Sequence, residues 1–519
     1  MPQFESLIGL LLAAVALAAA ARRLGVPSPA FLAIGGAILA FVPGMPTFAL
    51  DPDLALALFV APVLLDAAYD TSPRDLRDNW LPVSGLAIVA VLVTIAAVAW
   101  ITRLLVPQMP WAAAITLGAV IAPPDAAAAT AVLRQVQPPH RILTILEGES
   151  LLNDATALLI YRLAVAAAIT HAFSIGQVAP TFLLAVAGSL IMGPLLAQLT
   201  LWALLRITDP PSAIIMQFIT TFGVWILADR LGLSAVLTMV AYAITVARRA
   251  PERQPARLRI PSYAVWDTVV FIMNVLAFIL IGLQVRPILE GLEREARTQY
   301  FLVAVAVLIT VIVVRFVWVM TYNYFYRLYV RRYGFHPRRP MLPPTVKGAL
   351  LIAWSGMRGI VTLAAALALP VGAEGVQFPY RNLIVLTAFC VVLGTLVLQG
   401  LTLKPLVRAL DLHDDDPVGR EVTLARDRAV KAALSTLDGD DSPAAKAVRL
   451  NYKTLLQRAG RRPDEGECGS NVHDDLRRRA MHAARQSAAE MRRSDEIGDD
   501  AFHRLEEELD WVEMSDAIR

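Results

Sequence analysis

Residues 118–130 read Gly-Ala-Val-Ile-Ala-Pro-Pro-Asp-Ala-Ala-Ala-Ala-Thr, with two prolines and an aspartate in the middle of an apolar segment. Pro123 and Pro124 remove two backbone donors, so they break a helix here. Unwound backbone at membrane depth is tolerated only where it faces protein or a wet cavity. Asp125 follows the break, where it can offset the exposed dipole of the second half-helix. A simple proline kink is the alternative interpretation, but the sequence Pro-Pro-Asp favours a functional site here.

A second interruption lies near the end of the apolar part of the chain, where residues 354–362 read Trp-Ser-Gly-Met-Arg-Gly-Ile-Val-Thr. Gly356 and Gly359 permit a break or close helix packing. Arg358 needs a partner such as a carboxylate or the carbonyl end of a half-helix. The two interruptions fall in the fifth and twelfth apolar segments, which cross a membrane in opposite directions. This pattern indicates an inverted-repeat transporter with a site at the midplane.

The composition divides the chain into two parts. Of the 519 residues, 56% are hydrophobic and 18% are charged, whereas soluble domains carry about 25% charged residues. Residues 1–410 hold 29 Lys/Arg and 19 Asp/Glu, and residues 411–519 hold 18 and 25. We therefore expect a transmembrane exchanger domain over 1–410 and a cytoplasmic polar tail over 411–519. A disordered protein, a disulfide scaffold and a nucleic-acid binder are disfavoured, and Cys390 and Cys468 suggest no metal site.

Thirteen segments are long and apolar enough to approach the roughly 20 residues that cross a bilayer. They are 5–21, 28–43, 54–69, 81–101, 111–133, 143–169, 179–205, 212–229, 232–247, 263–285, 300–326, 346–370 and 382–408. Twelve is the alternative count, because several segments are short or join through tight turns. With the N-terminus outside, inner loops hold eighteen Lys/Arg and outer loops six. This bias supports thirteen spans and a cytoplasmic tail.

The densest group of polar residues inside a segment is Glu-Gly-Glu-Ser-Leu-Leu-Asn-Asp at 147–154. Ser150 and Asp154 share one helix face, and Glu149 and Asn153 share the adjacent stripe. A carboxylate with a hydroxyl one turn away is a good donor set for a small hard cation. A charge at this depth costs at least about 2.5–3.5 kcal/mol, which favours a transport role for Asp154. Pairing with Arg is the alternative, and for Glu147 the two interpretations are balanced.

Four other charged residues lie inside apolar segments. Asp66 is a second ligand, an entrance carboxylate or an interfacial residue. Arg315 stands alone among Val and Ile, and Glu149 is its obvious partner. Asp267 is interpreted mainly as a structural residue near the interface, and Arg162, two turns beyond Asp154, has no assigned partner.

At these motifs the chain resembles the bacterial sodium/proton exchangers of the NhaP type, within the monovalent cation/proton antiporter family. The matching stretches are 61–69, 118–132, 145–161 and 354–370, with weaker matches at 278–284 and around Arg315. The resemblance covers roughly residues 5–408. The Asn153-Asp154 pair is similar to the electroneutral branch, whereas electrogenic relatives carry Asp-Asp.

The resemblance implies a role for each matching residue. Asp154 would bind Na⁺ and H⁺ alternately, with Ser150 and Asp66 as further Na⁺ ligands and Asn153 beside them. The remaining implied roles are Asp125, Pro123 and Pro124 at the unwound stretch, a buried ion pair of Glu149 with Arg315, and Gly356, Arg358 and Gly359 in the second break. Some family members carry Thr where this chain has Pro124, so only its backbone carbonyl can face the ion.

We therefore predict an all-α polytopic membrane protein with about thirteen transmembrane helices, inverted repeats, and broken, crossing fifth and twelfth helices. It is predicted to exchange Na⁺ (or Li⁺) for H⁺ across the cell membrane by alternating access, as a homodimer in the lipid bilayer without cofactor or nucleic acid. K⁺/H⁺ exchange, an anion or organic-solute carrier, and a membrane sensor are the alternatives. No Gly-rich phosphate loop is found, and we predict no enzyme activity.

The tail shows amphipathic spacing around 419–436, 442–459, 473–493 and 499–515, which predicts helices. A small cytoplasmic bundle is one interpretation. A regulatory module that senses pH is the other, and the histidines that suggest it are His413, His473, His482 and His503.

Overall fold

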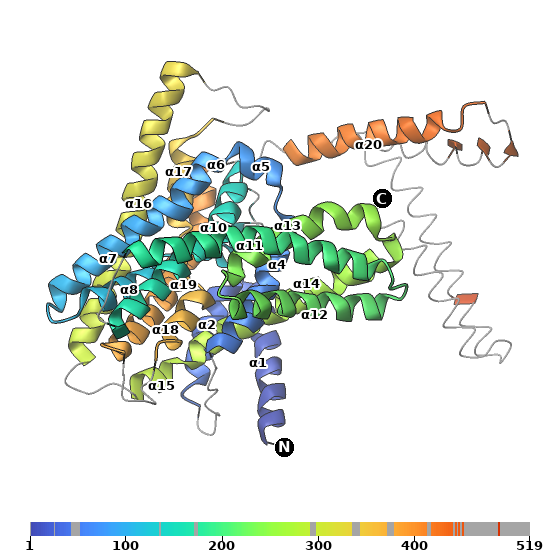
Figure 1. Cartoon of the computed structure of the whole chain (residues 1–519). Coiled ribbons are helices and arrows are strands. Elements are labelled where there is room, and N and C mark those ends of the chain that lie inside the picture. The colour runs from blue at the N-terminus through green and yellow to red at the C-terminus, as the bar shows by residue number, and fades with distance from the viewer. Residues whose placement is uncertain are drawn as a thin grey trace. The chain divides into compact units, whose positions relative to one another are not determined.

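The computed structural model describes residues 2–24, 26–42, 52–133, 136, 138–170, 175–290, 297–334, 343–370, 378–412 and 417–439, with a few more between 442 and 487. The chain divides into two compact units, Met1–Asp416 and Pro417–Arg519. Every regular element of the described residues is a helix (Figure 1). The predicted all-α fold is therefore confirmed. The tail residues His413, His473, His482, His503 and Cys468 lie outside the described residues.

The first unit contains nineteen α-helices and two π-helical stretches within its described residues. In chain order these are α1 (Pro2–Leu24), α2 (Ser28–Leu39), α3 (Pro52–Ala55), η1 (Leu56–Val60), α4 (Ala61–Asp70), α5 (Pro73–Asp78), α6 (Trp80–Ser84), η2 (Gly85–Ala90), α7 (Val91–Leu105), α8 (Trp111–Ile121), α9 (Ala126–Leu133), α10 (His140–Thr170), α11 (Ile175–Leu204), α12 (Pro210–Arg230), α13 (Ala235–Arg253), α14 (Ala256–Leu283), α15 (Val285–Glu290), α16 (Arg297–Tyr333), α17 (Val346–Trp354), α18 (Ile360–Leu367) and α19 (Arg381–Leu410).

Each of the thirteen expected segments overlaps a helix or a run of shorter helices. Seven helices of the described residues are long and apolar enough to cross a membrane, and shorter apolar helices accompany them. The protein is thus a multi-pass membrane protein. Several helices are longer than expected. The helix α16 runs to Tyr333, beyond the expected end at 326. The prediction is shorter because the last turns of the helix are rich in Tyr and Arg and are not apolar enough to be counted as part of a membrane span.

Both predicted helix interruptions are present. The helix α8 ends at Ile121 and α9 begins at Ala126, so Pro123 and Pro124 lie in non-helical backbone. The helix α17 ends at Trp354 and α18 begins at Ile360, which leaves residues 355–359 unwound. The two breaks meet, because the backbone N–H of Asp125 donates to the carbonyl of Met357 at 2.7 Å. This contact satisfies two backbone groups that the breaks release.

Close backbone packing fixes the position of α14, which forms one side of the site described below. The helix packs against α2. A Cβ on Gly282 would lie 2.5 Å from the backbone nitrogen of Ala37, and a Cβ on Gly36 would lie 3.1 Å from the Cα of Ile279. Only glycine fits at these two positions, so the two backbones approach as small residues allow in membrane helices.

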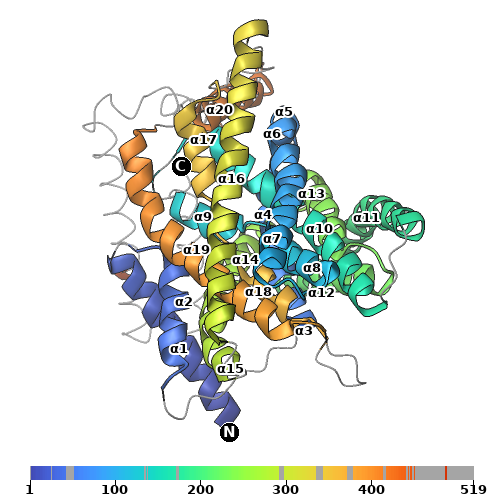
Figure 2. The ribbon, with the colours of Figure 1, turned by 90° about the vertical axis from the view of Figure 1, so that its left-hand side faces the viewer.

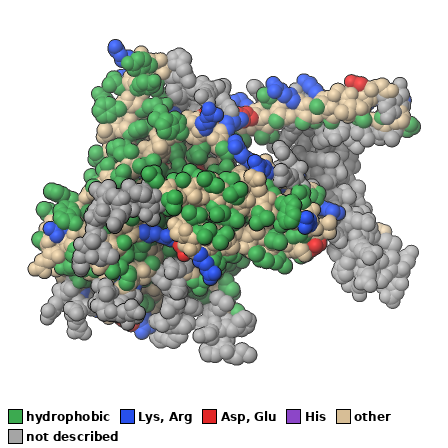
Figure 3. Space-filling model, in the orientation of Figure 1, with side chains coloured by type: hydrophobic (Ala, Val, Ile, Leu, Met, Phe, Trp, Pro, Cys, Tyr) green, Lys and Arg blue, Asp and Glu red, His purple; other side chains and the backbone are tan. Residues whose placement is uncertain are grey.

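The flanks of the first unit are apolar. Leu12, Trp100 and Leu184 are exposed, and Figure 3 shows hydrophobic side chains covering the surface of α11 and α12. Hydrocarbon is the natural environment for such a surface, since contiguous apolar patches of this extent are rare on soluble monomers. The helix α16 packs along α7 and α19 (Figure 2).

In the second unit, α20 (Pro417–Ser435) is the long described helix. It coincides with the first expected tail helix at 419–436. Short helical pieces lie inside the second expected range, 442–459, and the ranges 473–493 and 499–515 fall almost wholly outside the described residues. The role of this unit stays a prediction.

Candidate functional site

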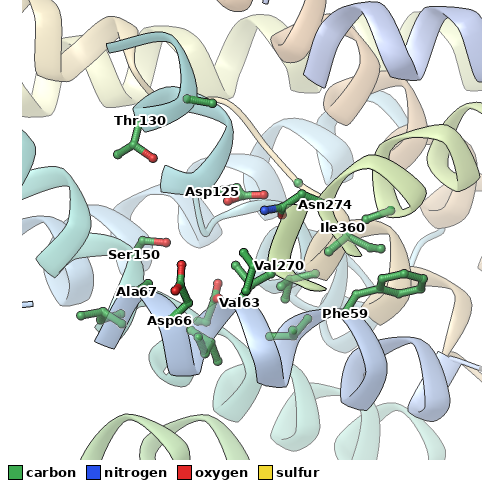
Figure 4. Close-up of a pocket in the computed structure, with 18 of the residues that line it drawn as sticks. Phe59, Val63, Asp66, Ala67, Asp125, Thr130, Ser150, Val270, Asn274 and Ile360 are labelled. Carbon is green, nitrogen blue, oxygen red and sulfur yellow. The ribbon is translucent and has the colours of Figure 1, made fainter. Parts of the chain in front are cut away.

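A cavity of about 340 Å³ lies where α4, the break between α8 and α9, α10, α14 and α18 meet. Its described lining includes five carboxylates and no Lys, Arg or His; the carboxylates belong to Asp66, Asp125, Glu147, Asp154 and Asp267. Figure 4 shows Asp66, Asp125 and Ser150 around the same space. A hollow with this charge attracts cations and repels anions.

The helix α10 supplies one face of the cavity. Glu147, Ser150, Leu151 and Asp154 line it, and their spacing of three, four and seven residues places them on one helical stripe. Asp154 is only 7% exposed, and its carboxylate makes no hydrogen bond or ion pair with any described residue, while the charge that acts on it is the acidic Asp125. A buried carboxylate without a protein partner is left to bind a proton or a cation from the cavity.

Asn153 lies on the adjacent stripe and supports the broken helix. Its side-chain amide Nδ2 donates to the Pro124 carbonyl at 2.9 Å, in a buried position. Its Oδ1 is buried and accepts no hydrogen bond from any described residue. The amide therefore holds the unwound backbone beside the cavity without adding a second charge next to Asp154.

The carboxylate of Asp125 lies against the second break. A Cβ added at Gly359 would overlap that carboxylate and lie 2.5 Å from Asp125 Cγ and 2.8 Å from Asp125 Cβ. Gly359 has φ −127° and ψ −156°, which any residue can adopt. The site needs glycine here for space, because Asp125 occupies the position of a side chain in front of α18.

Gly359→Ala is therefore expected to displace Asp125 and lower the rate of transport by roughly a hundredfold, the cost of about 1 Å of misplacement in an active site. The matched control is Gly400→Ala on α19. Its Cβ would make ordinary contacts of 3.5 Å with Met357 Sδ and 3.6 Å with Ala30 Cβ. Initial transport rates at equal protein density measure both variants. Equal activity in the two would contradict the packing argument.

Glu149 and Arg315 form a two-point ion pair inside the protein. Arg315 Nη1 donates to Oε1 of Glu149 at 2.5 Å and Nη2 donates to Oε2 at 2.9 Å. The side chains are 2% and 4% exposed. Arg315 Nη2 also donates to the carbonyl of Ile352 at 3.1 Å, which the break after α17 leaves without its helical partner. The pair thus joins α10, α16 and the broken helix.

Gly356 and Arg358 lie beside this pair. A Cβ on Gly356 would lie 2.7 Å from Arg315 Nε, so the glycine makes room for the guanidinium. Arg358 is 1% exposed, and its Nε and Nη1 have no partner among the described residues. Its guanidinium is under the electrostatic influence of Arg315 and Glu149. At these two nitrogen atoms the expected partner of Arg358 is thus not found among the described residues, and the carboxylate that acts on it electrostatically, Glu149, is paired with Arg315.

Arg162, which had no assigned partner, binds Asp229 on α12 at 2.7 Å near the surface. It lies away from the cavity lining.

Three polar residues of the lining were not identified from the sequence. They are Thr130 on α9, Asn274 on α14 and Thr362 on α18. Asn274 lies about two turns beyond Asp267 in a mostly apolar run, and that spacing is the clue that the sequence offers. Asp267, for which the sequence favours a structural role near the interface, lines the cavity together with Asn274, and its role stays a prediction.

The cavity thus offers carboxylate, hydroxyl, amide and carbonyl oxygens, the ligands that hard cations prefer. Within the described residues, no three side chains of His, Cys, Asp or Glu form a metal-binding group. The chemistry available at the site is reversible binding of a cation or a proton to a carboxylate.

Comparison with known proteins gives a family and a fold. The family model described as "Sodium/hydrogen exchanger, transmembrane" matches residues 10–409. An uncharacterized Na⁺/H⁺ exchanger of Mycobacterium tuberculosis is 30% identical over 95% of this chain and 92% of its own length. A sodium, potassium, lithium and rubidium/H⁺ antiporter of Bacillus subtilis is 30% identical over 82% of this chain and 64% of its own, so the chain spans under two thirds of that relative.

Among solved structures, the sodium proton antiporter MjNhaP1 from Methanocaldococcus jannaschii superposes with a TM-score of 0.60 at 17% identity. The match covers 79% of this chain and 99% of that one. At this level of identity, the likeness concerns the fold.

Proposed function

Since this chain belongs to the sodium/hydrogen exchanger family, we propose that it exchanges Na⁺ or Li⁺ for H⁺ across the cell membrane, for pH and sodium homeostasis. The observation that carries the proposal is Asp154. Its carboxylate is buried, has no counter-charge among the residues that the structure describes, and lines a cavity of oxygen ligands between two broken helices.

Competition at Asp154 accounts for exchange. A carboxylate that binds a proton releases the cation, and one that binds the cation releases the proton. Ser150 and Asp66 supply further oxygens to the cation, and the carbonyl of Pro124, oriented by Asn153, supplies another. Alternating access then exposes Asp154 to one side of the membrane at a time. The charged site crosses only when it is occupied, because a bare carboxylate is costly in the membrane.

The neutral side chain of Asn153 supports electroneutral exchange. Only one residue of the Asn153-Asp154 pair titrates, which fits one cation for one proton. Two titrating carboxylates at these positions would carry an additional charge in each cycle.

We further propose that residues 1–410 form the exchanger domain and that it works as a homodimer. The N-terminus would lie outside and the tail, 411–519, in the cytoplasm, where it has a regulatory or a purely supportive role. The excess of Lys and Arg in the inner loops supports this orientation.

K⁺/H⁺ exchange is the second candidate. The antiporter of Bacillus subtilis is named for four alkali cations, and the oxygens that line this cavity are of kinds that also bind K⁺. An anion or organic-solute carrier is disfavoured by the five carboxylates of the lining.

The test uses the purified full chain in liposomes with an imposed pH gradient, followed by a fluorescent pH dye. Addition of NaCl or LiCl is expected to collapse the gradient, with and without valinomycin and K⁺ to clamp the voltage. A response to KCl of equal size would select the second candidate. No response to any of the three salts, from protein that is folded and inserted, would reject cation/proton exchange.

A further inference from the structure

The helix α14 lines the cavity with a stripe of its own. Asp267, Val270, Phe271, Asn274, Ala277 and Phe278 all contribute, and their spacing corresponds to one face of a helix. Asp267 and Asn274 are the polar members, two turns or about 10 Å apart along the helix axis. This stripe provides oxygens on a wall of the cavity formed by a different helix from the one that carries Asp154.

Asp267 is a carboxylate inside a membrane-spanning helix that has no structural role visible in its contacts. It lies within the span 257–290. Its side chain is exposed and makes no hydrogen bond or ion pair with any described residue. Ionisable residues in such helices almost always face a water-filled cavity or a partner and mark the route of an ion. Asp267 lines the cavity, which is an environment of this kind.

A contact between α4 and α14 fixes the depth of Asp267 relative to Asp66. The hydroxyl groups of Tyr69 on α4 and Tyr263 on α14 lie 3.4 Å apart. Asp66 precedes Tyr69 by three residues and Asp267 follows Tyr263 by four, so each carboxylate lies about one turn, or 5.4 Å, from the tyrosine contact. The tyrosines do not line the cavity and the two aspartates do. The aspartates therefore lie at the same end of the cavity, just inside this contact.

Electrostatics gives this arrangement a function. The described lining contains no cationic side chain that would neutralise Asp267. An unpaired carboxylate in a recess with low-dielectric walls raises the local concentration of cations and their rate of entry. Asn274, two turns along α14 from Asp267, points toward Asp125 (Figure 4), so the polar residues of the α14 stripe extend from Asp267 to the broken helix.

We propose that Asp267 recruits the cation at the mouth of the cavity, as a positioning residue that raises the occupancy of the site without binding the ion during translocation. This inference rests on the proposed exchange. In this proposal α14 governs the entry of the cation, and Asp154 on α10 is the residue at which the cation and the proton compete. Loss of the Asp267 carboxylate should therefore weaken the apparent affinity for the cation and leave the maximal rate of exchange almost unchanged.

The test is Asp267→Asn in inside-out vesicles, with initial rates measured over a range of Na⁺ concentrations. The KM for Na⁺ is expected to rise roughly fivefold, as for the loss of one nearby charge screened by protein and water, and the maximal rate to change by less than about twofold. Raising the ionic strength with choline chloride should increase KM more in the wild type than in the variant. Asp267→Glu should restore the wild-type KM.

The matched control is Glu290→Gln on α15, which removes one carboxylate from a surface pair with Arg286 outside the cavity lining. Its KM should stay at the wild-type value. A lowered maximal rate with unchanged KM in Asp267→Asn, or equal KM in Asp267→Asn and Glu290→Gln, would overturn the proposal. If the proposed function were wrong, the wild type itself would show no exchange in these vesicles. Exchange by the wild type therefore distinguishes a failure of this proposal from a failure of the proposed function.

A second variant keeps the test decisive if Asp267→Asn does not insert. Asp267→Cys, in a chain whose Cys390 and Cys468 are replaced by Ser, accepts thiol reagents of either charge. The anionic sulfonatoethyl reagent should lower KM towards the wild-type value, and the cationic trimethylammonium reagent should raise it further. Equal KM after both treatments would show that charge at this position does not govern entry.

Discussion

Asp154→Asn is expected to abolish cation-driven proton flux at every pH and cation concentration. The substitution keeps the shape of the side chain and its burial at 7% exposure, so packing on α10 is preserved. It removes the one group of the Asn153-Asp154 pair that can hold either a proton or a positive ion. Without a titrating group there is no competition between the two substrates, and the loss should be complete rather than partial.

Two measurements separate this effect from misfolding. The variant should reach the membrane and elute from size exclusion as the wild type does. Its thermal stability in detergent should no longer increase with Na⁺, because a ligand stabilises only the state that binds it. Glu290→Gln should retain both flux and Na⁺-dependent stabilisation. Residual Na⁺-driven dequenching in Asp154→Asn above the level of empty vesicles would contradict the assignment of Asp154.

The sequence predicted the parts of the site that depend on local backbone chemistry. Pro123 and Pro124 cannot continue a helix, and the structure has the break there. Ser150 and Asp154 share a face because four residues make one helical turn, and both line the cavity. These inferences need only one helix at a time.

Features that need two helices were harder to predict. Several helices form the cavity that Asp267 lines, so the sequence of α14 alone does not indicate that this residue faces it. The contact of Asp125 with Gly359 joins residues more than two hundred positions apart, and no periodicity in either segment indicates it. The pairing of Glu149 with Arg315 is predicted because Arg315 is a lone cation among Val and Ile and because the family resemblance implies this pair. The sequence assigns no specific partner to Arg358, the third charge beside them.

Breaking the Glu149–Arg315 ion pair is expected to have the second large effect, a loss of protein stability. The size of this loss should depend on which of the two residues is replaced. Removing one partner of a buried pair typically costs about 3–5 kcal/mol, because the remaining charge is left uncompensated. Here Glu149 lies among two arginines, Arg315 in direct contact and Arg358 close enough to interact electrostatically. Glu149→Gln leaves two buried guanidinium groups without a counter-charge. It should therefore destabilise the protein more than Arg315→Met, which leaves Glu149 with Arg358 nearby.

Thermal unfolding in detergent, followed by size exclusion after heating, measures the relative stabilities of these variants. Arg315→Met with Arg358→Met should cost more than the sum of the single changes, since only the pair of substitutions strands Glu149. The reference substitution is Gly400→Ala, which adds a methyl group in ordinary contact beside the same break. Strictly additive effects of the two arginine changes would show that Arg358 does not compensate Glu149.

Exchanging the two charges tests whether the surroundings of the Glu149–Arg315 pair favour one orientation of the ion pair over the reverse. Arg315 Nη2 donates to the Ile352 carbonyl near the end of α17, where the half-helix carries its negative pole. In the double variant Glu149→Arg with Arg315→Glu, a carboxylate would face that carbonyl. The swapped pair should thus remain less stable than the wild type even though both charges are present. Full recovery of the wild-type unfolding temperature would mean that the pair acts through its mutual attraction alone, and that the carbonyl end of α17 contributes nothing to its orientation.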